Sequence, residues 1–135
     1  MASAKYAGVL LYAIKPGVAR NDDKLVFLLA GEPRKNGTDL VYGDLGGKTE
    51  GSETVEATAV REMMEEIMYL LPPVDVSSDP TVLTDTIGTV YLHKIPYSDD
   101  LPVKFKSALG VARRHGMLST AKKGYFEVRD LKWVT

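Results

Sequence analysis

The stretch from Gly46 to Tyr69 reads GGKTEGSETVEATAVREMMEEIMY and decides what this chain can be. It places two glycines before an acidic loop, and after the loop arginine and glutamate residues recur at helical spacing. If each of six key positions had about a one-in-fifteen chance of holding its residue, a given window would match with a probability on the order of 10⁻⁷. Chance is therefore a poor explanation. The six residues are Gly47, Glu53, Arg61, Glu62, Glu65 and Glu66.

The second half of this stretch predicts an amphipathic helix over residues 54–71. At about 100° per residue, Glu62, Glu65 and Glu66 share an arc of about 100°, and apolar side chains occupy the opposite side. Three carboxylates on one helix face repel one another, and a divalent cation would remove that repulsion. The spacing alone also fits a solvated helix face, but the glycine and Glu53 at their fixed distances favour a functional site.

Outside this stretch the pattern is mainly that of β-strands. Apolar runs rich in β-branched and aromatic residues alternate with turns that contain Gly, Pro, Asn and Asp. We expect strands at 6–14, 24–30, 40–45 and 125–134, and one long or two paired strands at 81–97 around Gly88. We also expect a short second helix at 105–118, interrupted at Gly110 and Gly116.

Length and composition bound the possibilities further. With 135 residues, 14.8 kDa and 44% hydrophobic residues, we expect a single domain over residues 1–135. No apolar run approaches the roughly 20 residues of a membrane span, and the start lacks the apolar stretch of a secretory signal, so we expect a soluble, cytoplasmic protein. The chain has no cysteine and two histidines, so any metal site should consist of oxygen ligands.

These oxygen ligands point to a particular chemistry. Magnesium prefers carboxylates, keeps several waters and is commonly shared with substrate phosphates, and manganese is an alternative. Gly46 and Gly47 would let the backbone follow a tight path close to the metal or a phosphate. Such a site supports attack of water on a phosphorus atom, with a carboxylate that is free of metal as the general base.

The same residues resemble the Nudix box, the signature of hydrolases that cut a nucleoside diphosphate linked to another group. The box runs Gly, five residues, Glu, seven residues, Arg-Glu, an apolar residue, any residue, Glu-Glu, any residue, Gly and an apolar residue. The match extends from Gly47 to Tyr69, and the one departure is Met68 in place of the final glycine. Because that glycine closes the helix in the family, we expect a further helical turn to Leu71 here.

The resemblance implies both a fold and residue roles. The implied fold is α+β, a Nudix-type α/β/α sandwich with a central mixed β-sheet. The implied metal ligands are Glu62, Glu65 and Glu66, together with the carbonyl of Gly46, and Glu53 is a further metal candidate that would also pair with Arg61. Lys48 and Gly47 would meet a phosphate. The implied catalytic residues are Glu62, Glu65 and Arg61, with Glu62 favoured as general base and Glu127, Asp99 and Asp100 as alternatives.

Two functions follow as hypotheses. The first is a Mg²⁺-dependent pyrophosphohydrolase that acts on a small nucleoside diphosphate derivative: a nucleotide, a dinucleotide polyphosphate, a nucleotide sugar or an RNA cap. The second is a Nudix-fold nucleotide-binding or regulatory module that does not cut its ligand. The pairs Arg113-Arg114 and Lys122-Lys123 would suit a capped RNA. The sequence leaves open the substrate, the number of metal ions and whether the chain forms a homodimer.

Overall fold

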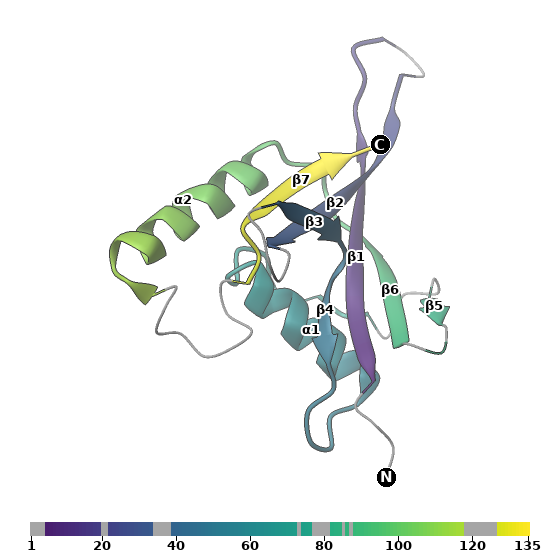
Figure 1. Ribbon diagram of the computed structural model, residues 1–135. Helices are drawn as coiled ribbons and strands as arrows, with labels where there is room; N and C mark the ends of the chain where they lie inside the picture. Colours follow the sequence, from purple (N-terminus) through teal and green to yellow (C-terminus); the bar gives the residue numbers. More distant parts are fainter. Residues whose placement is uncertain are drawn as a thin grey trace.

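The computed structural model describes residues 5–19, 22–33, 39–72, 74–76, 82–84, 86, 88–117 and 127–135, which fold into one mixed β-sheet and two helices (Figure 1). The strands are β1 (Tyr6–Lys15), β2 (Lys24–Pro33), β3 (Leu40–Gly43), β4 (Leu45–Lys48), β5 (Val82–Thr84), β6 (Gly88–Lys94) and β7 (Asp130–Val134), and the helices are α1 (Val55–Glu66) and α2 (Asp100–Arg114).

The long strand β1 organises the sheet. It pairs in parallel with β6 along one edge, whereas its other edge is divided between two antiparallel partners. β4 pairs with the first half of β1 and β2 with the second half, so β2 and β4 diverge near Leu10. Beyond that point β2 pairs with β3 on one side and β7 on the other. The divergence opens the sheet where β3 leads into β4.

The hydrophobic core lies on one face of the sheet. The buried positions of β1 and β2 alternate, as expected for strands with one covered face. Both helices contribute to this same core, α1 through residues such as Met63 and α2 through residues such as Phe105. The strand residues on this face are Ala7, Val9, Leu11 and Ala13 from β1 and Val26, Leu28 and Ala30 from β2.

The start and the buried face of α1 confirm the helical periodicity, but its predicted end is wrong. Thr54 caps the helix by accepting a hydrogen bond from the Ala57 amide at 3.1 Å. The helix ends at Glu66, five residues before the expected end, because Met68 and Tyr69 both turn left-handed with φ values of 55° and 57°. The chain therefore makes the turn that a glycine makes in the Nudix box, and makes it without one.

The later elements also differ in their bounds. Two paired strands stand in the 81–97 region, as expected, although β6 ends at Lys94. The second helix begins at Asp100, earlier than predicted, and runs through Gly110 without interruption. It ends at Arg114, and Gly116 then adopts a φ of 68°. Leu118 lies outside the described residues.

The last strand is shorter than predicted. β7 begins at Asp130, whereas residues 127–129 are not part of a strand, and residues 125 and 126 lie outside the described part. Trp133 fastens this strand to the beginning of α2, because its indole N–H donates to the Ser98 carbonyl at 2.8 Å.

The mixed central sheet with two helices confirms the α+β expectation. Within the described residues, neither helix is long and apolar enough to cross a membrane.

Candidate functional site

The glycine pair, which was expected to give the backbone a tight path, lies inside strand β4 and is extended. Gly46 pairs with Gly8 and Gly47 with Ala7 of β1. A Cβ added to Gly47 would overlap the carboxylate of Glu62, and one added to Gly46 would overlap the ring and hydroxyl of Tyr6. Glycine is needed here because side chains from α1 and β1 lie directly against the β4 backbone.

Glu53 and Arg61 pair tightly and join the loop after β4 to α1. The Arg61 Nε donates to Glu53 Oε2 at 2.7 Å and its Nη2 donates to Glu53 Oε1 at 3.0 Å. The same carboxylate accepts from the Glu50 amide and the Thr58 hydroxyl, each at 3.1 Å. Hydrogen bonding to Arg61 lowers the pKa of Glu53 to about 2. Both oxygens are thus occupied by protein groups, which places Glu53 as a brace of the loop.

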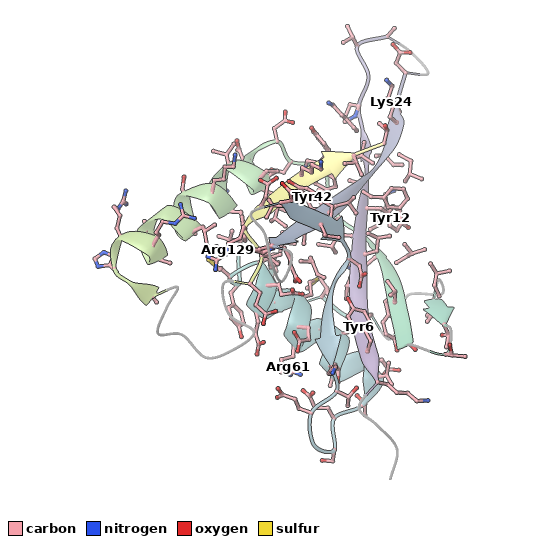
Figure 2. The ribbon with its side chains drawn as sticks, viewed as in Figure 1. Tyr6, Tyr12, Lys24, Tyr42, Arg61 and Arg129 are labelled. Atoms are coloured by element: carbon pink, nitrogen blue, oxygen red, sulfur yellow. The ribbon has the colours of Figure 1, made fainter. Side chains whose placement is uncertain are left out.

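Arg61 is the hub of this end of the molecule, where Figure 2 shows it beside the loop that leads into α1. Besides Glu53, its Nη1 reaches Glu62 Oε1 at 3.0 Å and Glu65 Oε2 at 3.4 Å. Its Nη2 donates to the carbonyl of Lys48 at 3.3 Å. One guanidinium therefore balances the loop acid and two of the three acids on the helix arc.

Glu66 is separated from the other two helix acids. Its side chain is only 2% exposed, and within the described residues no hydrogen-bond partner reaches its Oε1. Burial, the neighbouring Glu32 and the more distant Glu62 together raise the pKa of Glu66 to about 11, and the Gly46 amide opposes this shift. Burial also raises the pKa of Glu62, against the opposing effect of Arg61.

Three carboxylates from separate elements gather at the buried end of α1. One oxygen each of Glu32, Glu66 and Glu127 lies within 4.8 Å of the others. Glu32 comes from β2, Glu66 from α1 and Glu127 from the segment before β7. An all-carboxylate donor set with a buried, unpartnered oxygen fits a hard divalent cation such as Mg²⁺ or Mn²⁺.

Sequence reasoning missed Glu32, although a signal for it exists. Residues 31–33 read as the turn that closes the second strand, whereas β2 continues through Pro33. Val26, Leu28 and Ala30 face the core, so Glu32 is the next residue in that inward alternation. A glutamate at a position of the strand that faces the core was the signal that could have identified Glu32 as a site residue.

Two other predicted candidates lie elsewhere. Asp99 accepts a hydrogen bond from Tyr97 at the start of α2, and the amide of Asp100 donates to Ser98. Of the three alternative general bases, the structure brings Glu127 alone into the group of acids. Lys48 is exposed at the end of β4, and its proposed contact with phosphate stays a prediction.

A cavity of about 270 Å³ opens beside the three acids where β2 and β4 diverge. Its lining includes Glu32, Tyr42, Asp44 and Gly46, and the hydroxyl of Tyr6 donates to Asp44 at 2.6 Å across it. A second cavity of about 510 Å³ shares Tyr6 and Asp44 with it and extends over apolar strand residues. Of the three acids, Glu32 is the one that lines the smaller cavity, and none of them lines the larger one.

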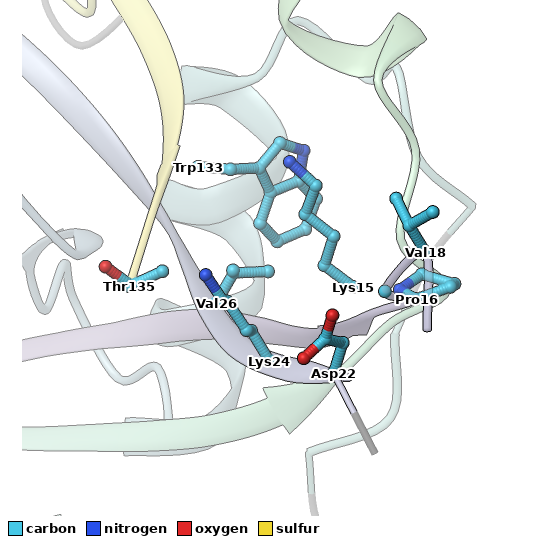
Figure 3. Close-up of a pocket in the computed structure, with 9 residues that line it drawn as sticks. Lys15, Pro16, Val18, Asp22, Lys24, Val26, Trp133 and Thr135 are labelled. Atoms are coloured by element: carbon cyan, nitrogen blue, oxygen red, sulfur yellow. The ribbon is translucent and has the colours of Figure 1, made fainter. Parts of the chain in front are cut away.

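A further pocket, shown in Figure 3, lies at the other end of the β1–β2 pair. Lys15, Lys24 and Trp133 line it, and Asp22 is the one acidic side chain among its described lining residues. None of the Glu residues discussed above lines this pocket, so it is separate from the candidate site.

Comparison with known proteins gives structural likenesses only. No family model matches the sequence, and no curated protein matches it. The apo structure of T. brucei MERS1 is 19% identical with a TM-score of 0.48, and the match covers 71% of this chain and 39% of that protein, so this chain spans about two fifths of its length.

Two further solved structures are similar at the same level. A mutT/nudix family protein from Listeria innocua is 15% identical with a TM-score of 0.49, and the match covers 87% of this chain and 99% of that one. A C. elegans Ap4A hydrolase is 18% identical with a TM-score of 0.45, with 72% and 69% covered. The solved structures to which this chain is similar thus include proteins of the Nudix/MutT family, whose signature its sequence resembles.

Proposed function

We propose that this protein is a divalent-metal-dependent hydrolase that cleaves the diphosphate linkage of a nucleoside diphosphate derivative. The observation that carries the proposal is the buried, unpartnered oxygen of Glu66 beside two further carboxylates. Leaving a carboxylate oxygen buried without a partner costs stability, and a bound cation would offset that cost. Nucleotides, dinucleotide polyphosphates, nucleotide sugars and capped RNA are the substrate candidates.

The chain's own groups have distinct tasks in this proposal. Glu66 would hold the cation. Glu62 and Glu65 lie on the same helix, and each forms an ion pair with Arg61. A bound Mg²⁺ or Mn²⁺ would supply Lewis-acid polarisation of the phosphoryl oxygens. Gly47 leaves room for Glu62 against β4, and Lys48 would meet a phosphate at the exposed end of that strand.

The general base would be Glu62 or Glu127. Burial raises the pKa of Glu62 towards the range in which a carboxylate accepts a proton from water more effectively. Glu127 lies among the acids and comes from a segment outside regular structure. Glu62 is the base we favour, since Arg61 also orients its carboxylate.

Product analysis against a substrate panel tests this proposal. The wild-type protein is incubated with each substrate class and Mg²⁺ or Mn²⁺, and products are separated by chromatography. Glu66→Gln should lower turnover at least about a hundredfold while the protein stays folded. Glu56→Gln, an exposed carboxylate in the first turn of the same helix, should retain activity within about twofold.

The outcome also separates the two hypotheses about function. Cleavage of one substrate class that depends on both metal and Glu66 supports the hydrolase. If every substrate survives and calorimetry detects nucleotide binding, the protein is a nucleotide-binding module and the proposal is wrong.

A further inference from the structure

The three acids that gather at the end of α1, Glu32, Glu66 and Glu127, are called the acidic trio below. Glu66 belongs to the Nudix-like stretch and Glu127 to the segment before β7, whereas Glu32 comes from β2. We infer that Glu32, supplied by β2, is a direct ligand of the bound divalent cation together with Glu66 and Glu127. This inference rests on the proposed function, because it assumes that the trio exists to bind metal. It adds a ligand from the sheet to those that the helix provides.

The sheet fixes the position of Glu32 on both sides. In the pairing of β2 with β3, Glu32 lies opposite Val41, and the preceding Gly31 lies opposite Asp130 of β7. The amide of Arg129 also donates to the Gly31 carbonyl at 2.8 Å. Strand pairing therefore holds the backbone next to Glu32 from two directions. A rigid backbone of this kind suits a metal ligand, whose oxygen must stay in place when the ion binds.

The charge of the trio is not balanced by neighbouring protein groups. Within the described residues, no salt bridge joins Glu32, Glu66 or Glu127 to a cationic side chain, and every ion pair at this end of the molecule uses Arg61. Arg61 is already engaged by four acids, of which none belongs to the trio. Three carboxylates at such separations repel one another unless a proton or a cation lies between them.

A second observation indicates that the three acids bind a cation and are not a group of carboxylates without a ligand. Glu66 Oε1 is shielded from solvent and accepts no hydrogen bond from any described residue, although the Gly46 amide donates to the same carboxylate. A buried carboxylate oxygen with only a structural role would be expected to find a donor. The oxygens of the trio supply the kind of ligand that Mg²⁺ and Mn²⁺ prefer.

Access to the trio exists on the Glu32 side. Glu32 lines the cavity of about 270 Å³ together with Gly46 and Pro33. A cation bound by Glu32 would therefore lie next to β4, where a phosphate of the substrate would approach. Glu32 would thus join the metal to the part of the site that opens outwards.

The test is Mn²⁺ binding without nucleotide, measured by electron paramagnetic resonance and by the metal-induced shift in Tm. Glu32→Gln should raise the Kd for Mn²⁺ at least about tenfold and abolish most of the Tm shift. Its metal-free Tm should be close to that of the wild type, because the amide keeps an oxygen acceptor beside Glu66. Glu56→Gln, the matched control, should change Kd by less than about twofold.

A second variant keeps the inference falsifiable if Glu32→Gln fails to fold. Glu32→Asp retains the charge and withdraws the oxygen by one methylene, so it should weaken Mn²⁺ binding if the oxygen is a ligand and leave it unchanged if only charge matters. A folded Glu32→Gln or Glu32→Asp variant with the wild-type Kd overturns the inference.

The two proposals fail in different ways. Metal-dependent cleavage by the wild type together with wild-type Mn²⁺ affinity in Glu32→Gln would sink the role of Glu32 and leave the hydrolase proposal standing. Loss of Mn²⁺ affinity in Glu32→Gln without cleavage of any substrate would support Glu32 as a ligand and refute the hydrolase. A wild-type protein that binds no Mn²⁺ contradicts both.

Discussion

Replacing Glu53 by Gln should destabilise the protein, since Glu53 and Arg61 hold the loop after β4 against α1. The pKa of Glu53 falls from its ordinary value of 4.5 to about 2, mainly because Arg61 donates two hydrogen bonds to it. That difference corresponds to about 3.4 kcal/mol at 1.36 kcal/mol per pKa unit. Both side chains are 24% exposed, so solvent screening reduces the expected loss to about 2 kcal/mol.

The stabilisation by Glu53 should depend on pH in a defined direction. Because the folded-state pKa of Glu53 is depressed, the stabilisation is fully present above pH 4.5 and is lost as the pH falls from 4.5 towards 2. Urea unfolding of wild type and Glu53→Gln at pH 7 and pH 3 measures it, and the difference in unfolding free energy should fall by about half at pH 3. At pH 7 the loss of about 2 kcal/mol should lower Tm by roughly 5–8 °C.

Glu50→Gln is the matched control for the brace. The Glu50 carboxylate lies 3.8 Å from the same guanidinium but is 65% exposed, so its removal should cost less than about 0.5 kcal/mol. Equal losses from Glu50→Gln and Glu53→Gln, or a Glu53→Gln loss that does not change with pH, would refute the reasoning.

Three further predictions concern the glycine pair, the helix end and the buried acid. Gly47→Ala should cost about 1–3 kcal/mol by displacing Glu62, whereas Gly43→Ala, which has open space around its Cβ, should change the unfolding free energy by less than about 1 kcal/mol in urea titrations. Tyr69→Gly should be about 1 kcal/mol more stable than Tyr69→Ala because the φ of 57° favours glycine; Ala would be the more stable if the helix continued. In EDTA, the unfolding free energy should fall as the pH rises from about 5 to 9. The reason is the raised pKa of Glu66: in this range the folded state keeps a proton that the unfolded state releases. Urea titrations of Glu66→Gln should show no such fall.

Local patterns predicted the elements whose formation depends on local rules. The helical period in the box placed Ala59, Met63 and Ile67 on the buried side, and all three are in the core. This worked because burial of apolar area dominates the orientation of an amphipathic helix. The pairing of Glu53 with Arg61, which the family resemblance implied, is present with two hydrogen bonds.

The helix end was mispredicted because tertiary packing decided it. Without a glycine at position 68, local propensity favours another helical turn, yet Met68 packs against the core in a left-handed conformation. The amide of Tyr69 closes this turn with a hydrogen bond to the Met64 carbonyl at 2.9 Å. Packing of the following residues offsets the backbone strain, which a local pattern does not contain.

The acidic trio could be predicted only in part. Glu66 was a candidate ligand from its helical spacing as well as from the family resemblance, and Glu127 was a candidate base from the resemblance, but nothing in the sequence placed them together. Glu32 joins them through the pairing of β2 with β3 and β7, which are distant in the sequence. Such a meeting of long-range strands has no signature in any one segment.

The most direct test of the central claim, that these acids hold a divalent cation in order to hydrolyse a phosphoanhydride, is product analysis in water enriched in ¹⁸O. The substrate panel is incubated with wild-type protein and Mg²⁺, and phosphorus NMR and mass spectrometry follow the label. We predict one ¹⁸O atom on a phosphate of the product, formed with Mg²⁺ and absent in EDTA or with Glu66→Gln. Unlabelled products, or cleavage that is indifferent to both the metal and Glu66, would contradict the claim.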